Sequence, residues 1–193
     1  MKSVSISGST RSNVGKTDAK ALRNAKQVPC VLYGGKENIH FTIQKIPFNK
    51  VIITPNVYVI KLTIVGKEVN AIVKDLQFHP VSDDVLHVDF QQIFEDKPFS
   101  IKLPIKIVGV SDGVKQGGKL QIKMRKLKVN GLLKNMPNVI EIDISHLNIG
   151  NSVKIDSLKV ANLTFEEPKN AVVCSVNLTR SAARALQAEP AKK

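Results

Sequence analysis

The stretch VYVIKLTIVGKEVNAIVKDLQFH, residues 57–79, has the clearest β pattern in the chain. It contains two runs rich in β-branched residues, 57–65 and 68–79, joined through Val65-Gly66-Lys67. Alternation of apolar and polar side chains with a period of two is typical of strands, and a short connection containing glycine is what a hairpin requires. The stretch therefore predicts two neighbouring antiparallel strands.

The same pattern recurs on both sides of this hairpin. Further strands are expected at residues 2–7, 28–33, 39–44 and 85–92. Six short strands favour closure into a barrel. Two short helices are expected between them: residues 19–26, capped by Thr17 or Asp18, and residues 47–53, beginning near Pro47.

Beyond residue 98, strands predicted at 99–108, 120–129, 139–144, 153–160 and 171–177 form a second unit. The sequence thus predicts an all-β protein with minor helix, in which an N-terminal six-stranded β-barrel is followed by a second β domain. The domains expected are 1–92 for the barrel, 93–178 for the second domain and 179–193 for a basic tail. We expect that tail to be a frayed helix or disordered.

Composition limits the class of protein. The chain has 193 residues, of which 29 are Lys or Arg and 16 are Asp or Glu, giving a net charge of +13. No apolar run approaches the roughly 18 residues that span a bilayer, and the first 25 residues do not form a secretory signal. Cys30 and Cys174 each lie in an apolar, strand-like run. We therefore expect a cytoplasmic protein with buried thiols, without disulfide or membrane.

Positive charge is concentrated in two places. Residues 1–36 hold seven basic residues and one acid, whereas residues 37–92 are net negative by one. This imbalance favours a contact face for a polyanion over an ordinary solvated surface. A second set, the basic cluster, has no acid between its ends and comprises Lys115, Lys119, Lys123, Arg125, Lys126, Lys128 and Lys134. It is either a second anion-binding edge or a set of lysines that protect an exposed strand.

A phosphate-binding loop is suggested by Gly15-Lys16-Thr17, with Gly8 upstream. A P-loop has four residues between its first glycine and the Gly-Lys pair, and here there are six. Asp89 ends an apolar run as a magnesium-binding Asp does, but βαβ units are missing. Neither His79 nor His87 has a partner at metal-ligand spacing. We expect no catalysis, no cofactor, no metal and no small-molecule substrate.

The segment around Lys16 fits nucleic acid better. Lys16, Lys20 and Arg23 are spaced by four and three, which places them on one helical face if the helix begins near Lys16. Such a row can follow a phosphate backbone, and Arg11 lies just upstream. The alternative is a solvated helix face.

Two strands add polar side chains opposite apolar ones. Leu86, Val88 and Phe90 alternate with His87, Asp89 and Gln91, and Leu76 and Phe78 oppose a second polar set, Asp75, Gln77 and His79. A carboxylate beside a polyanion is costly, so Asp89 is expected to accept hydrogen bonds from base amino groups. A protonated His87 would favour binding at lower pH. The alternative for both histidines is an ordinary surface role.

Several motifs in this order resemble a known family. They are Arg11, Gly15-Lys16, Leu22-Arg23, Val28-Pro29, Leu32-Tyr33-Gly34-Gly35, Gln77-x-His79-Pro80 and His87-Val88-Asp89-Phe90. Together they resemble the bacterial 5S-rRNA-binding large-subunit ribosomal proteins of the protein-twenty-five family. The run from Val139 to Gly150 is similar to the second β domain of its longer, Ctc or general stress protein, members.

The resemblance implies a barrel that binds the loop E region of 5S rRNA through a widened minor groove, as part of cytoplasmic ribosomes. It implies contacts to RNA from Arg11, Lys16, Lys20, Arg23, Tyr33, Gln77, His87 and Asp89. The chain departs from the family at Lys20 and Ala21, where Arg is frequent, and at Thr17-Asp18, where small residues are usual. Asp18 places a negative charge beside the expected site.

For the second domain, the implied partners are neighbouring large-subunit rRNA or ribosomal proteins. A different class of function stays open beside this one. The protein would then be a stress-linked adapter whose β domain, 93–178, binds a protein partner.

Overall fold

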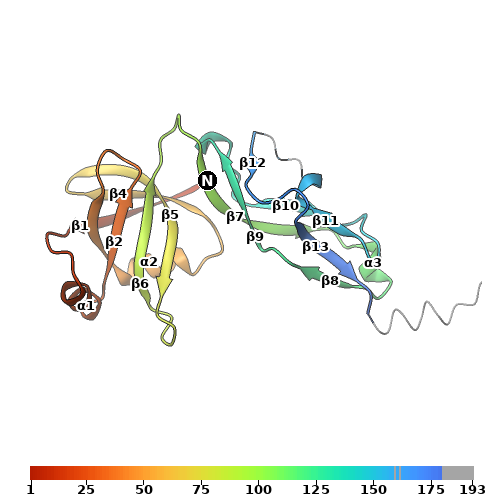
Figure 1. Ribbon diagram of the computed structural model, residues 1–193, viewed down its shortest axis with the longest axis horizontal. Coiled ribbons are helices and arrows are strands. Elements are labelled where there is room, and N and C mark those ends of the chain that lie inside the picture. The colour runs from red at the N-terminus through yellow and green to blue at the C-terminus, as the bar shows by residue number, and fades with distance from the viewer. Residues whose placement is uncertain (159, 161, 180–193) are drawn as a thin grey trace, which may run out of the picture. The chain divides into compact units, whose positions relative to one another are not determined.

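The computed structural model describes residues 1–158, 160 and 162–179. The chain divides into two compact units (Figure 1). Unit 1 is Met1–Phe99 with Leu132–Asn138, and unit 2 is Ser100–Gly131 with the described residues from Val139 onward. Of the tail expected at 179–193, only Thr179 is described, and its hydroxyl donates to the Gly117 carbonyl at 2.6 Å.

Unit 1 is a closed six-stranded barrel, as predicted. Its strands follow one another around the barrel in the order β1-β3-β2-β6-β5-β4, and β1 closes it by pairing in parallel with β4. Their bounds are β1 Lys2–Thr10, β2 Gln27–Tyr33, β3 Ile39–Gln44, β4 Tyr58–Ile64, β5 Lys67–Phe78 and β6 Val85–Gln92. Closure gives every strand two neighbours and leaves no edge strand in this sheet.

The β4–β5 hairpin has the tight turn that the sequence predicts. Ile64 pairs with Lys67, so Val65 and Gly66 alone form the loop, with φ angles of 48° and 73°. Positive φ at both central residues is the geometry whose twist matches antiparallel strands. Gly66 adopts it without strain, whereas Val65 is a β-branched residue in an unfavourable region.

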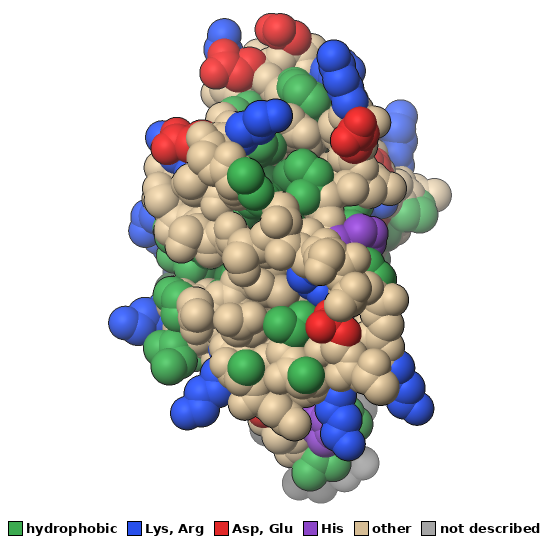
Figure 2. All heavy atoms as spheres, turned by 90° about the vertical axis from the view of Figure 1, so that its left-hand side faces the viewer, with side chains coloured by type: hydrophobic (Ala, Val, Ile, Leu, Met, Phe, Trp, Pro, Cys, Tyr) green, Lys and Arg blue, Asp and Glu red, His purple; other side chains and the backbone are tan. Residues whose placement is uncertain are grey.

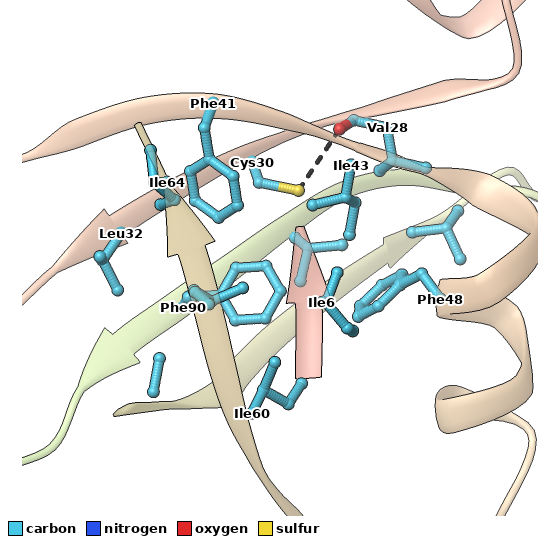
Figure 3. Packing of buried hydrophobic residues seen from close by; sticks show 14 residues of the cluster. Ile6, Val28, Cys30, Leu32, Phe41, Ile43, Phe48, Ile60, Ile64 and Phe90 are labelled. Carbon is cyan, nitrogen blue, oxygen red and sulfur yellow. Dashed lines mark hydrogen bonds between the residues drawn. The ribbon is translucent and has the colours of Figure 1, made fainter. Parts of the chain in front are cut away.

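Apolar side chains of the six strands and one helix fill the barrel (Figure 3). Phe90 lies among them with no exposed surface, its ring centroid 5.5 Å from that of Phe41 and 5.8 Å from that of Phe48. A Cβ at Gly8 would lie 2.7 Å from the Phe41 ring. Gly8 is therefore explained by close packing and not by a phosphate loop.

Both predicted helices form, but the first begins differently. Helix α1 spans Lys16–Asn24 after an N-cap at Gly15, and it has no side-chain cap. The prediction that Thr17 or Asp18 caps the helix is wrong, because the Asp18 carboxylate pairs with Arg11 instead. Helix α2 spans Lys45–Ile52.

Unit 2 has two open sheets. One has the order β10-β7-β9-β12, with bounds Ile140–Asp143, Phe99–Val108, Lys126–Gly131 and Thr164–Phe165. The other has the order β11-β13-β8, with bounds Ser152–Lys154, Val172–Asn177 and Lys119–Ile122. Two short helices of unit 2, α3 Asp112–Lys115 and η2 Ile155–Ser157, have no counterpart in the prediction, and neither has η1 Leu133–Asn135, which belongs to unit 1.

Two strand predictions for unit 2 are wrong. The expected strand 120–129 is two strands, because the backbone N–H groups of Lys123 and Met124 donate to the Val173 carbonyl and the chain passes from one sheet to the other. The expected strand 153–160 ends at Lys154, where η2 begins. The short strand β12 was not predicted.

Both cysteines are buried free thiols, as expected. Cys30 lies in β2 and Cys174 in β13, and neither has exposed surface. Burial raises the pKa of both thiols above its ordinary value. Within the described part of the chain, no helix is long and apolar enough to cross a membrane.

Candidate nucleic-acid interface

Three neighbouring strands of the barrel, β2, β6 and β5, bring the predicted strand residues together. The register pairs His87 with Gln77, and it pairs Asp89 with Asp75 on one side and Val31 on the other. Tyr33 pairs with Gln91, two residues after Asp89 on the same strand. Core residues alternate with these positions along the strands, so their side chains lie together on the outside of the barrel. We call this surface the polar face; it comprises Tyr33, Asp75, Gln77, His87 and Asp89.

A close contact between His87 and Asp89 lies at the centre of the polar face. His87 Nδ1 lies 2.8 Å from Asp89 Oδ1, and the two side chains are 28% and 34% exposed. The contact involves one carboxylate oxygen of Asp89, so the second oxygen keeps its capacity to accept hydrogen bonds. The pair thus presents a fixed acceptor at the surface, as reading of a base amino group requires.

Tyr33 stays a neutral hydrogen-bonding group at this face. Partial burial raises the pKa of its phenol, and the carboxylates of Asp89 and Asp75 raise it further. A neutral phenol can donate to or accept from a base or ribose.

Asp75 is the residue of this face that the predicted site omits. The alternation had placed it outward with Gln77, but only the register with β6 shows that it faces Asp89. Two like charges opposite each other in a sheet are unfavourable, and a partner that donates hydrogen bonds relieves the repulsion. Phe78, expected to pack inward, is instead 46% exposed, because the register shifts at the end of β5.

Helix α1 carries the basic row: Lys16, Lys20 and Arg23. The helix begins at Lys16, which is the condition the prediction required for the three to share one face. All three residues are exposed. Arg23 Nε donates to the Leu86 carbonyl at 3.1 Å, which connects the row to β6 and therefore to the polar face.

Arg11 differs from the other predicted site residues. Its side chain is 8% exposed, and Nη2 lies 2.7 Å from Asp18 Oδ2. Its backbone N–H donates to the His40 carbonyl at 3.0 Å, so Arg11 is fixed to the barrel. The structure therefore shows Arg11 largely buried and paired with Asp18 of α1, the helix that carries the basic row.

The surface of unit 1 mixes charges of both signs. In the view of Figure 2, basic side chains project around the margin of the molecule and acidic side chains lie among them. Such a surface does not attract polyanions uniformly, so the arrangement of individual groups decides which RNA fits.

His79 has a local structural role. Its Nδ1 accepts hydrogen bonds from the backbone N–H groups of Val81 and Ser82, at 3.3 and 3.2 Å. These bonds shape the turn between β5 and β6. Among the described residues, no group of three or more His, Cys, Asp or Glu side chains is placed to hold a metal ion.

The basic cluster is divided between the units. Lys134 belongs to unit 1, and Lys115 and Lys128 pair with Asp112 and Glu166 at 2.9 and 2.5 Å. Its other members are exposed in unit 2 on β8, β9 and the connection between them: Lys119, Lys123, Arg125 and Lys126. Strand β8 is an edge of its sheet, where lysines oppose unwanted pairing.

Comparison with known proteins covers both units. The model of the Ribosomal L25p family matches residues 6–90, and that of the C-terminal domain of ribosomal protein TL5 matches residues 98–180. A large ribosomal subunit protein bL25 of Bacteroides fragilis is 46% identical over 187 residues, covering 94% of this chain and 95% of that protein.

Two further proteins of the same name show similar agreement. The one from Bacteroides thetaiotaomicron is 44% identical, and the match covers 94% of this chain and 95% of that protein. The one from Porphyromonas gingivalis is 41% identical, with 94% and 96% covered. The chain therefore belongs to the ribosomal L25p family, a family of structural, non-enzymatic ribosomal proteins, in its two-domain form.

Proposed function

We propose that this ribosomal protein is a structural constituent of the large subunit that binds 5S rRNA at its loop E region. The observation that carries the proposal is the polar face, where hydrogen-bond donors and acceptors lie on adjacent strands beside a cationic helix. Residues 1–92 would then be the RNA-binding domain, working with ribosomes in the cytoplasm.

The two parts of the interface suit different parts of an RNA. The basic row supplies positive charge that neutralises phosphates, which gives affinity without reading sequence. The polar face includes Asp75 and Asp89, which phosphates would repel, so its role is contact with base edges. A widened groove with non-Watson–Crick pairs exposes such edges, whereas a regular RNA helix presents mainly shape and 2′-hydroxyl groups.

The experiment compares a loop E fragment with a fully paired hairpin of equal length over a salt series. Both RNAs carry similar charge, so phosphate contacts alone bind them equally. We expect the preference for loop E to persist at about 200 mM salt, where nonspecific binding through several phosphates has lost orders of magnitude. Equal affinities that fall together with salt would contradict the proposal.

For the second domain, 93–178, we propose contacts with neighbouring large-subunit rRNA or ribosomal proteins. The four exposed cations of the basic cluster support a polyanionic neighbour. Affinity capture of the full chain from a bacterial lysate tests this: we expect ribosomal components. Capture of a non-ribosomal protein that survives RNase treatment would favour the adapter alternative.

A further inference from the structure

The three-stranded sheet of unit 2, β11-β13-β8, has one apolar side and one polar side. Val153, Cys174 and Val176 are buried. Side chains alternate along a strand, so the residues next to these three lie on the other side of the sheet. We call this other side the amide face; it comprises Lys119, Gln121, Ser152, Ser175 and Asn177.

Hydrogen bonds between side chains order the amide face. Ser175 pairs in register with Gln121, and Asn177 pairs with Lys119. Ser175 Oγ donates to Asn177 Oδ1 at 3.1 Å, and Asn177 Nδ2 donates to Gln121 Oε1 at 2.6 Å. Among the described residues, the Gln121 amide nitrogen has no acceptor. The chain of bonds therefore holds Gln121 with its two N–H donors directed to a partner outside the protein.

The charge of the amide face differs from that of the polar face of unit 1. Strands β8, β11 and β13 contain no Asp or Glu. Lys119 is exposed, and Lys123, a second exposed cation, follows directly after β8. The polar face of unit 1 includes two carboxylates that repel phosphates, whereas the amide face offers amide donors, hydroxyl groups and cations. It is therefore suited to contact a phosphate backbone.

The residue types also favour one class of partner over others. The same three strands contain no aromatic residue, and single-stranded nucleic acids are bound largely by stacking of bases on aromatic rings. The core of a protein–protein interface is enriched in aromatic residues and depleted in lysine. A regular RNA duplex, in contrast, is contacted mainly through its phosphates and 2′-hydroxyl groups. Lysine, amide and hydroxyl groups on a sheet match those chemical groups.

We infer that the amide face of unit 2 is a second RNA-contact surface, and that its partner is the backbone of a regular RNA duplex. The inference rests on the proposed function, in which the second domain contacts a neighbour within the large subunit. It names the surface that makes the contact and selects RNA instead of protein as the neighbour. Lys119 and Lys123 bind phosphates, and the Gln121 amide donates to a phosphate or a 2′-hydroxyl oxygen.

The test adds a labelled regular RNA duplex to the full chain already saturated with the loop E fragment. Loop E then occupies the polar face and the basic row, so the duplex joins only through another surface. We expect a ternary complex whose affinity falls with salt. A single strand with the same number of phosphates should bind more weakly, because the amide face offers no ring for stacking. Displacement of loop E without a ternary complex, or equal binding of strand and duplex, would overturn the inference.

Gln121→Glu removes the free donor and keeps the acceptor that Asn177 uses. We expect the affinity of the loop E complex for the duplex to fall at least about tenfold, because a hydrogen bond to a charged partner is lost. Gln116→Glu is the control, since Gln116 is an exposed residue at the end of α3 and gains the same charge. Its effect should stay below about twofold. Equal losses in the two variants would show that charge alone explains the binding, against the inference.

A lysine pair tests the contact with phosphate. Lys119→Ala should lower the salt slope of duplex binding by about one, whereas Lys102→Ala, which removes an exposed lysine of β7 in the other sheet, should not change it. Both variants should bind the loop E fragment as the wild type does. A wild-type chain without loop E preference would overturn the proposed function of unit 1. Loop E preference without duplex binding to the complex would overturn the present inference alone.

Discussion

The two units of this chain differ in how their strands are paired. Unit 1 closes its sheet, so every strand of six to twelve residues has two neighbours. Unit 2 uses two open sheets, with four edge strands between them and several strands of only two to four residues. A closed sheet forms a rigid outer surface on which side chains from three strands keep fixed spacing. The polar face depends on that rigidity, because base edges are read by position.

The difference extends to charge. In unit 1, acids and bases lie close together and are used in pairs, as in Arg11–Asp18, His87–Asp89 and Lys45–Asp84. Unit 2 also has ion pairs, Lys106–Glu141, Lys115–Asp112 and Lys128–Glu166, but its exposed cations gather along β8, the connection that follows it and the start of β9. A mixed surface suits selective contact, and a surface of one sign suits contact that depends on charge alone. Substitutions in each unit test this contrast, and the largest expected effect is on the packed core.

Phe90→Ala removes the ring that contacts two other aromatic rings in the closed core. We expect the free energy of unfolding of the barrel to fall by about 4 kcal/mol, and Leu127→Ala to cost unit 2 about 3 kcal/mol. Denaturant unfolding, with hydrogen exchange to assign each loss to its unit, provides the measurement. Val81→Ala, at an 88% exposed position, is the control. A loss below about 1 kcal/mol for Phe90→Ala would contradict a tightly packed closed barrel.

Asp89→Ala removes the fixed acceptor of the polar face. We expect discrimination between loop E and the paired hairpin to fall by about 2 kcal/mol, because one base-specific contact is lost. Competition binding with both RNAs measures this ratio. Glu68→Ala removes an exposed acid at the far end of β5 and should leave the ratio unchanged. An equal change in both variants would show that charge, and not the contact, explains the effect.

Lys16→Ala tests the basic row against the basic cluster of unit 2. We expect weaker binding to both RNAs alike and a salt slope lower by about one, as loss of a single phosphate contact predicts. Lys123→Ala removes an equal charge from unit 2 and should not change binding to the isolated loop E fragment. Equal effects of the two variants would remove the distinction between the units.

The smallest effect concerns acid stability. The pKa of Asp84 is lowered by its hydrogen bond and ion pair with Lys45, and that of Asp143 by hydrogen bonds from Ser145. A lowered pKa in the folded state means stability that is present above the unfolded pKa of 3.8 and is lost as pH falls through the folded value. Unfolding measured from pH 6 downward should show both losses. Added salt should weaken the contribution of Asp84, measured against Asp84→Asn, and spare that of Asp143.

Much of unit 1 could be predicted because its strands are long. Six of its alternating runs became the six barrel strands, and the Val65-Gly66 turn lies where glycine indicated it. In unit 2, strands of two or three residues are too short for a period of two to be visible. The break at Lys123 and Met124 is set by their bonds to Val173, fifty residues away in sequence, which no local pattern records.

The candidate site shows a similar division. Helical spacing predicted the basic row, and alternation predicted the outward side of His87 and Asp89. The position of Asp75 opposite Asp89 needed the strand register, which depends on the bulges of β5. The ion pair between Arg11 and Asp18 could not be predicted, because the distance between residues seven apart across a loop is not fixed by the sequence pattern.

Each unit contains one buried thiol, whose rate of chemical labelling reports how often that unit opens. Cys30 reports on the barrel and Cys174 on unit 2. A reagent that reacts with thiolates reaches either cysteine only when the strand that contains it separates from its neighbours. The ratio of their labelling rates therefore compares the opening frequencies of the two units within one molecule, without mutation. Binding of RNA to the polar face should slow labelling of Cys30 alone, since Cys30 pairs in register with Val88 between His87 and Asp89.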